Sequence, residues 1–225
     1  MNLYDYLLYD HDGTLTYSHE GIYACLRHTL RVLGRPEPDD KPLRKCVGPP
    51  LFYDFAVVLG LGEELAARAT EIYRAEYART GMWQNKLVEG AETALETLKK
   101  QGYVSAIATS KAQNFADGIE DGFGIAKYFQ AVVGSGLDGS LNTKAAVINA
   151  AMERLGAPRE NCLMIGDRRQ DVEGARENGI DCAILLCGYG EDGVFETLPP
   201  TYTFRGFKEL TEFLRRYRSS AFSCL

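Results

Sequence analysis

The sequence predicts an α/β fold, a doubly wound and mostly parallel sheet with an inserted all-helical domain. After residue 90, short apolar runs alternate with stretches whose apolar residues recur every three or four positions, which indicates strands separated by helices. Such alternation implies parallel pairing through right-handed crossovers. Between residues 15 and 85 the patterns are helical and no strand is evident. We therefore expect residues 1–15 and 86–225 to form the α/β domain and residues 16–85 to form the helical insertion.

The elements follow from local patterns. The first apolar run, residues 4–9, predicts a buried strand that joins the sheet, because a turn-rich cluster follows it directly. Helical spacing extends from about residue 18 to 33, where Gly34 and Pro36 end the helix, and helical patterns continue from about residue 42 to 80. The elements predicted after residue 90 are helices 91–101, 112–121, 144–155 and 171–178, and strands 103–109, 130–133, 162–165 and 181–186.

Composition and charge exclude several classes of protein. The 225 residues are 45% apolar and 25% charged, which is ordinary for a globular chain that buries roughly 70% of its extended surface. The net charge of −6, without a long Lys/Arg run, argues against a nucleic-acid partner. No apolar stretch approaches the ~20 residues of a membrane span and no signal peptide is evident, so we expect a cytoplasmic protein without a membrane partner. The six cysteines form no CxxC pair, which favours reduced thiols over a zinc site or disulfides.

Polar side chains follow several predicted strands at the point where each strand ends. In an open parallel sheet, ligands bind at the carboxyl ends of the strands, where the loops converge. Carboxylates, hydroxyls and ammonium groups from four separate loops are therefore expected at one edge. They are Asp10 and Asp12 after the first strand, Thr109, Ser110 and Lys111 after the second, Lys144 at the helix after the third, and Asp167 with Asp171 after the strand 162–165.

These segments, in this order, resemble the four motifs of the haloacid dehalogenase-like hydrolases, specifically of their phosphatases. Any one motif is weak, but four in order with the expected spacing are specific, and the resemblance covers nearly the whole chain. The helical insertion resembles the cap domain that follows the first motif in the phosphoglycolate phosphatase-like branch. The resemblance therefore implies a Rossmann-like core with a helical cap. The segments are Asp10-His11-Asp12-Gly13-Thr14, Thr109-Ser110-Lys111, Lys144 and Gly166-Asp167-Arg168-Arg169-Gln170-Asp171.

The resemblance implies hydrolysis of a phosphomonoester through an aspartyl-phosphate. A carboxylate nucleophile splits one difficult displacement into two easier ones, and the family pattern makes Asp10 that nucleophile. Asp12 is then the general acid for the leaving alcohol and later the general base for water. Lys144 is expected to neutralise the phosphoryl oxygens, and Ser110 to donate a hydrogen bond to them. Thr109 and Lys111 complete the expected substrate contacts of the core.

A cluster of aspartates also implies a metal ion. Two like charges about 4 Å apart repel by ~4 kcal/mol at an effective dielectric constant of 20, and a phosphate dianion adds to the repulsion. A hard divalent cation that prefers oxygen ligands relieves it, and Mg²⁺ suits a site with few protein ligands. The family pattern implies the Asp10 side chain, the Asp12 backbone carbonyl and Asp167 as ligands, with Asp171 in support.

The insertion carries the expected specificity residues. Residues 48–51, which include Gly48 and Pro49, resemble the cap segment that faces the substrate in phosphoglycolate phosphatase-like and nucleotidase-like members. Arg44 and Lys45 lie close by in the sequence and could contact a second anionic group of a substrate. We expect the partner of the chain to be a small phosphorylated molecule, and the protein to be a monomer or a homodimer.

Each of these residues also has a structural interpretation. Asp10 and Asp12 could merely shape a turn, and Ser110 could cap the helix predicted near residue 112. Lys144 could lie on a solvated helix face, and Asp171 could cap its own helix, a role compatible with one at the site. Four charged residues could equally be solvated side chains on the surface: Arg44, Lys45, Arg168 and Arg169.

Two residues depart from the family pattern, and one segment resembles the binding motif of a different class of protein. His11 stands where the family usually has an apolar residue, and strand alternation predicts a structural side chain that points away from the two aspartates. Tyr17 replaces an acidic residue that is common after the first motif and is expected to order the loop. Residues 188–193 satisfy G-x-G-x-x-G, but Pro199 and Pro200 block a long helix behind them, so a glycine-rich turn is the better interpretation than a dinucleotide site.

The substrate and the reaction stay open among related alternatives. The strongest resemblance is to phosphoglycolate phosphatases, so phosphoglycolate is the first candidate substrate. Residues 134–140, ahead of Lys144, look like a nucleotidase-like subgroup, so a nucleoside monophosphate is the second candidate. A phosphomutase would share every core residue. A dehalogenase would not need Asp12, and nothing marks a cap lysine for the Schiff base of a phosphonatase. A non-catalytic binding protein of the same fold is the alternative of a different class.

Overall fold

The computed structural model describes residues 4–190 and 193–222, and the chain divides into two compact units. One, here called the sheet unit, consists of Met1–Leu15 and Leu87–Leu225, and the other, the helical unit, is Thr16–Lys86. The second boundary lies one residue beyond the one predicted after residue 85. Each unit has its own buried apolar residues.

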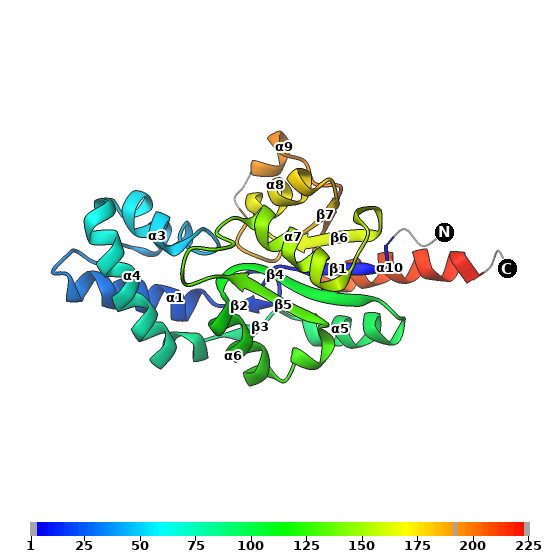
Figure 1. Ribbon diagram of the computed structural model, residues 1–225, viewed down its shortest axis with the longest axis horizontal. Helices are drawn as coiled ribbons and strands as arrows, with labels where there is room; N and C mark the ends of the chain where they lie inside the picture. Colours follow the sequence, from blue (N-terminus) through cyan, green and yellow to red (C-terminus); the bar gives the residue numbers. More distant parts are fainter. Residues whose placement is uncertain (1–3, 191–192, 223–225) are drawn as a thin grey trace. The chain divides into compact units, whose positions relative to one another are not determined.

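The sheet unit is built on a six-stranded sheet of order β5-β4-β1-β6-β7-β8 (Figure 1). Every pair of neighbouring strands is parallel. β1 lies in the middle, where Tyr9 is in register with Ile107 on one side and Ile165 on the other. The predicted parallel α/β sheet is therefore confirmed. The strands are β1 (Tyr6–Tyr9), β4 (Val104–Ala112), β5 (Ala131–Ser135), β6 (Cys162–Gly166), β7 (Asp181–Leu185) and β8 (Tyr202–Phe204).

Helices cover both faces of this sheet (Figure 1). On one face, Leu8 of β1 packs in a cluster with Ile148 of α7 and Val172 of α8. On the other face, the ring of Tyr9 contacts that of Phe207 in α10. Burying such a side chain contributes about 1.5–3 kcal/mol, so the alternation of β1 fixes its register. The helices are α5 (Ala91–Lys100), α6 (Gln113–Phe123), α7 (Lys144–Leu155), α8 (Arg169–Asn178), α9 (Val194–Thr197) and α10 (Phe207–Phe222).

Two parts of the sheet unit differ from the predicted elements. β4 continues to Ala112, and its pairing with β5 is irregular between Ala108 and Ala112, so α6 begins one residue later than predicted. The sequence patterns did not lead us to predict β8 or α10. β8 is too short to show alternation, whereas the buried Phe207 and Leu210 of α10 do follow helical spacing.

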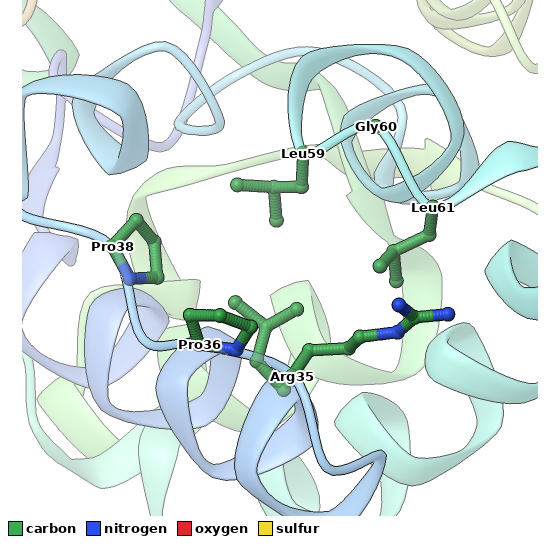
Figure 2. A pocket seen from close by; sticks show the side chains of 7 residues that line it. Arg35, Pro36, Pro38, Leu59, Gly60 and Leu61 are labelled. Atoms are coloured by element: carbon green, nitrogen blue, oxygen red, sulfur yellow. The ribbon is translucent and has the colours of Figure 1, made fainter.

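The helical unit packs α1 against α4, and a small residue is needed where its segments approach one another. A Cβ atom on Gly21 would lie 2.0 Å from the carbonyl oxygen of Gly81. A cavity of about 270 Å³ is lined by the segments that contain Pro36 and Leu59 (Figure 2). The helices are α1 (His19–Val32), α2 (Asp40–Arg44), α3 (Leu51–Tyr53) and α4 (Gly62–Arg79), with a π-helical segment at Asp54–Val58 and a 3₁₀ turn at Gly81–Trp83.

One prediction about the segment between residues 15 and 85 is wrong. Thr16–Tyr17 forms β2, which pairs with β3 (Lys86–Leu87) in a two-stranded sheet. A two-residue strand has no periodicity that a sequence pattern could reveal. Tyr17, which replaces the expected acidic residue, therefore lies in a paired strand.

Two further observations concern the helices and the cysteines. Among residues 4–190 and 193–222, no helix combines the length and the apolar composition that a membrane span requires. The cysteines at positions 25, 46, 162, 182 and 187 are free thiols, and Cys224 lies outside the described residues.

Candidate active site

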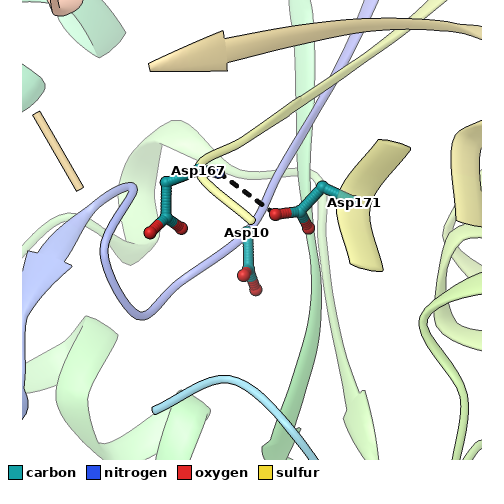
Figure 3. A group of neighbouring side chains, drawn as sticks. All are labelled: Asp10, Asp167 and Asp171. Atoms are coloured by element: carbon teal, nitrogen blue, oxygen red, sulfur yellow. Dashed lines mark hydrogen bonds between the residues drawn. The ribbon is translucent and has the colours of Figure 1, made fainter. Parts of the chain in front are cut away.

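Three buried carboxylates meet at the carboxyl end of the sheet (Figure 3). Asp10 follows β1, Asp167 follows the neighbouring β6, and Asp171 lies in the first turn of α8. One oxygen from each of the three side chains lies within 4.8 Å of the others. The backbone NH of Asp10 donates to the carbonyl of Ile165 at 2.9 Å, which extends the β1–β6 pairing to the site. Parallel pairing thus brings together aspartates that are far apart in the sequence.

Two glycine-containing loops hold Asp167 in place. The hydroxyl of Thr14 donates to Asp167 Oδ1 at 3.1 Å, and the NH of Tyr189 donates to Oδ2 at 2.6 Å. A Cβ atom on Gly13, whose φ is +88°, would lie 2.2 Å from Asp167 Oδ2, and one on Gly188 would lie 2.4 Å from Asp167 Cβ. Both glycines are therefore required for close approach to the carboxylate.

The Gly188-Tyr189-Gly190 turn belongs to the site, a role that sequence reasoning missed. The sequence pattern predicts only a glycine-rich turn there, and its Gly-Tyr-Gly order is the one signal that points to this loop. The helix that follows, α9, has four residues, which is too short to hold a pyrophosphate at its N-terminus. Glu191 and Asp192 of the G-x-G-x-x-G pattern lie outside the described residues.

Asp171 caps its own helix and also faces Lys144. Its Oδ2 accepts hydrogen bonds from the backbone NH groups of Asp167 at 3.1 Å and Arg168 at 2.9 Å, so it caps the first turn of α8. Its Oδ1 lies 3.0 Å from Lys144 Nζ. Burial raises the pKa of Asp171, and the ammonium group of Lys144 partly offsets that effect.

Lys144 is buried at the start of α7 and points into the cluster, so the alternative of a solvated helix-face lysine is excluded. Its Nζ lies 2.7 Å from Asp10 Oδ1 and donates to the carbonyl of Ala108 at 3.3 Å. The hydroxyl of Thr143 caps the helix by accepting from the NH of Ala146 at 3.1 Å, which fixes the point where the lysine leaves the backbone. Burial alone would lower the pKa of Lys144, but the charges of Asp10 and Asp171 outweigh it and raise that pKa.

The donor set fits a hard divalent cation. Three carboxylates face one ammonium group, so ionisation of all three leaves two negative charges in a buried site. Burial and the charges of Asp171 and Asp10 raise the pKa of Asp167 well above its ordinary value, and a nearby positive charge would favour its ionised form. All the available donors are oxygens, the atoms that Mg²⁺ prefers.

Asp12 lies in different surroundings from these three aspartates. Its Oδ2 is 3.0 Å from Lys111 Nζ and its Oδ1 is 3.3 Å from His11 Nδ1, and its side chain is 9% exposed. The expectation that His11 points away from both aspartates is wrong. The strand ends at Tyr9 and the chain bends at His11, so strand alternation does not extend to this position.

His11 links Asp12 to a fifth acidic residue. Its Nε2 lies 3.0 Å from Oε1 of Glu120 in α6, and both side chains are completely buried. Burial alone would lower the pKa of His11, but the adjacent carboxylates of Asp12 and Glu120 outweigh it and raise the pKa to about 9. Sequence reasoning missed Glu120, because a single acidic residue in an amphipathic helix carries no signal of its own.

The second motif lies in the irregular part of β4. Ala112, not Ser110, occupies the N-cap of α6, so helix capping does not explain Ser110. Ser110 is half-buried, and its carbonyl accepts a hydrogen bond from the hydroxyl of Ser135 at 2.9 Å. The hydroxyl of Thr109 accepts from the NH of Lys111 at 3.2 Å, which shapes the turn from which Lys111 reaches Asp12. Thr109 therefore has a structural bond in addition to its predicted contact with substrate.

The two arginines of the fourth motif differ. Arg169 is exposed, as predicted, and its Nε lies 2.7 Å from Glu173 Oε1. Arg168 is 5% exposed and its guanidinium lies 5.8 Å above the ring of Tyr189, so its interpretation as a solvated charge is wrong. A side chain in a tight turn beside a buried aspartate is covered by the neighbouring loop, which the local sequence does not reveal.

The predicted cap residues all belong to the helical unit. Arg44 and Lys45 are exposed at the end of α2, and Gly48 and Pro49 are half-buried before α3. Their role toward a substrate stays a prediction.

The comparisons agree with the geometry. Residues 7–185 match the family described as haloacid dehalogenase-like hydrolase. The chain is 37% identical to a 5'-nucleotidase of Pseudomonas aeruginosa, over 88% of this chain and 90% of that protein. It is 39% identical to the tyrosine-protein kinase PtkA of Mycobacterium tuberculosis, over 82% of this chain and 62% of that protein. It is 28% identical to a phosphoglycolate phosphatase of Colwellia psychrerythraea, over 93% of this chain and 96% of that protein. A crystal structure of a predicted phosphatase from Clostridium acetobutylicum superimposes with a TM-score of 0.90 at 38% identity, covering 95% of this chain and 99% of that one. The chain belongs to the haloacid dehalogenase-like hydrolases.

Proposed function

We propose that this hydrolase removes phosphate from a small phosphomonoester through a phosphorylated Asp10, with Mg²⁺ as its cofactor. The observation that carries the proposal is the unequal environment of Asp10 and Asp12. Asp10 lies beside Lys144 and two further aspartates, whereas Asp12 lies beside Lys111 and His11. Neighbouring carboxylates in different environments are suited to different roles.

The reaction has two balanced steps. An oxygen of Asp10 attacks phosphorus while the bond from phosphorus to the leaving oxygen breaks, and that oxygen takes a proton from the Asp12 carboxyl group. Water then attacks the aspartyl-phosphate and gives a proton to Asp12, and the bond between phosphorus and Asp10 breaks to release phosphate. Lys144 neutralises charge at the nucleophile, and Ser110 offers its hydroxyl to the phosphoryl oxygens.

The metal would be held by the side chains of Asp10 and Asp167, with Asp171 in support and the Asp12 backbone carbonyl as a further expected ligand. When bound, Mg²⁺ offsets the negative charge of the site and of the phosphoryl group. The turn at Gly188 and Tyr189 keeps Asp167 oriented, since both of its oxygens already accept hydrogen bonds.

A nucleoside 5'-monophosphate is the substrate that the comparisons favour over 2-phosphoglycolate. The 5'-nucleotidase of Pseudomonas aeruginosa is 37% identical to the chain and the Colwellia phosphoglycolate phosphatase 28%, which reverses the order that the motifs alone suggested. Arg44 and Lys45 in the helical unit are candidates for contact with the rest of the substrate.

The test is release of inorganic phosphate from a panel of phosphorylated metabolites, with kcat/KM measured for the best substrates. We expect Mg²⁺-dependent release that an Asp10→Asn substitution abolishes. Unchanged activity in that variant would refute the proposal. The relationship to PtkA and the phosphomutase alternative make a second readout necessary. Phosphate that moves to tyrosine, or to another position of the substrate, instead of to water would indicate a transferase.

A further inference from the structure

We propose that Glu120 and His11 form a buried relay that positions the Asp12 carboxyl group for proton transfer to the leaving group. This inference rests on the proposed function, to which it adds two positioning residues. His11 and Asp12 belong to the loop after β1 and Glu120 to α6, so all three lie in the sheet unit.

The contacts form a continuous chain. Glu120 Oε1 lies 3.0 Å from His11 Nε2, and His11 Nδ1 lies 3.3 Å from Asp12 Oδ1. The imidazole is thus placed between two carboxylates, one at each ring nitrogen, and its side chain and that of Glu120 are completely buried. A buried ring with a carboxylate near each nitrogen is held in one orientation. Its Nδ1 then holds Oδ1 of Asp12 in place.

Stability does not explain why these two polar residues are buried. A carboxylate and an imidazole lose hydration when they enter the core, and apolar residues of similar volume are often neutral or stabilising replacements for a buried ion pair. The neighbours of Glu120 on the same helix, Ala116 and Ile119, are buried apolar residues, so a leucine at position 120 would continue that face. The contact with Asp12 gives the pair a function that an apolar pair could not supply.

The position of the ring determines which oxygen of Asp12 is free to exchange a proton. A protonated carboxyl group that accepts a hydrogen bond on Oδ1 presents its O–H at Oδ2. Oδ2 is the oxygen that faces Lys111 Nζ at 3.0 Å. A bound phosphoryl group offers Lys111 another anionic partner, so Oδ2 can then donate to the leaving oxygen while His11 keeps the group in place.

The experiment uses the dependence of rate on the leaving group. Substituted phenyl phosphates with leaving groups of increasing pKa, together with an alkyl phosphate, are compared by kcat/KM, which covers the steps up to phosphorylation of Asp10. Poor leaving groups need the proton from Asp12, and activated ones do so much less. For Glu120→Gln we expect kcat/KM to fall by about 10- to 100-fold with the alkyl ester but by less than about 3-fold with 4-nitrophenyl phosphate.

Two controls separate positioning from folding. The double variant His11→Leu/Glu120→Leu removes both buried polar groups, so it should keep its melting temperature and still show the steeper leaving-group dependence. Glu96→Gln removes an exposed carboxylate of α5 that pairs with Lys100, and it should match the wild type throughout. If Glu120→Gln fails to fold, the double variant carries the test.

The outcomes are distinct. A steeper dependence in Glu120→Gln or the double variant supports the relay. An equal loss for all leaving groups, or no loss, overturns the relay while the proposed function stands. If the wild type hydrolyses none of the esters, the proposed function fails and the relay fails with it.

Discussion

Asp10 and Asp12 are separated by one residue, yet their carboxylates lie in different surroundings. Asp10 has Lys144 at 2.7 Å and shares a buried cluster with Asp167 and Asp171. Asp12 has Lys111 on one oxygen and His11 on the other, and it lies at the end of a chain of contacts that reaches Glu120. Two residues of the same type thus have different neighbouring groups, which suits their carboxylates to different roles.

The largest effect on activity is expected from substitution of Asp10. Asp10→Asn removes the nucleophile and should lower kcat by about 10⁴-fold or more. Asp12→Asn removes only proton transfer, worth about 10²- to 10⁴-fold, and should spare an activated aryl ester in the first step. Stopped-flow release of nitrophenol from both variants measures the difference. An equal decrease in the rate of nitrophenol release in both variants would show that the two carboxylates do not have separate roles.

Removal of the metal should also distinguish the two environments. Chelation of divalent cations should abolish turnover, and Mg²⁺ at about 100 times its Kd should stabilise the fold by about 2.7 kcal/mol, because it binds only the native state. Thermal melts with and without Mg²⁺ measure that shift. Asp167→Asn should lose the shift and Asp12→Asn, whose backbone carbonyl remains, should keep it. The same shift in all proteins would place the cation elsewhere.

A smaller effect is expected from the loop that orients Asp167. Gly188→Ala forces a Cβ to 2.4 Å from Asp167 Cβ and should destabilise the fold by about 1–3 kcal/mol with a loss of kcat. Gly179, at the C-cap of α8, has φ +67° and open space around a Cβ, so Gly179→Ala should cost about 1–2 kcal/mol without changing kcat. Denaturant unfolding and steady-state assays on both variants check this contrast. Equal kcat losses would mean that the close approach of Gly188 does not serve the site.

The smallest effect is expected at Arg169. Its side chain is 59% exposed and pairs with Glu173 one turn away, so Arg169→Ala should change the free energy of unfolding by less than about 0.5 kcal/mol. Urea unfolding with a kcat measurement checks it. The matched variant is Arg168→Ala, which removes a buried side chain beside Tyr189 and should cost more. An Arg169→Ala variant as impaired as Arg168→Ala would contradict the view that only the buried arginine contributes to stability.

The motifs predicted the carboxylate cluster because Asp10 and Asp167 follow neighbouring parallel strands and Asp171 lies one helical turn beyond, positions that periodicity and order reveal. Asp10, Lys144, Asp167 and Asp171 do converge as expected. The helix 144–155 has the bounds that were predicted, and in the structure Thr143 caps its start and Gly156 its end.

Other features depend on contacts between distant segments and could not be predicted in the same way. His11 was placed by extending strand alternation past Tyr9, where the chain had already bent. Glu120 and Arg168 are polar residues in stretches that look solvated, and only the packing of α6 and of the Tyr189 loop buries them. β2 consists of two residues whose strand character comes from pairing with β3.

The most direct test of the division of labour is to trap the phosphorylated enzyme. Asp12→Asn is mixed with 4-nitrophenyl phosphate and Mg²⁺, quenched in acid, and its peptides are mapped by mass spectrometry. The first step should proceed with this leaving group and the second should stall without a general base. The account predicts a burst of one nitrophenol per active site and a phosphoryl group on Asp10. Turnover without any phosphorylated Asp10, or a phosphoryl group on Asp12 in the wild type, would contradict it.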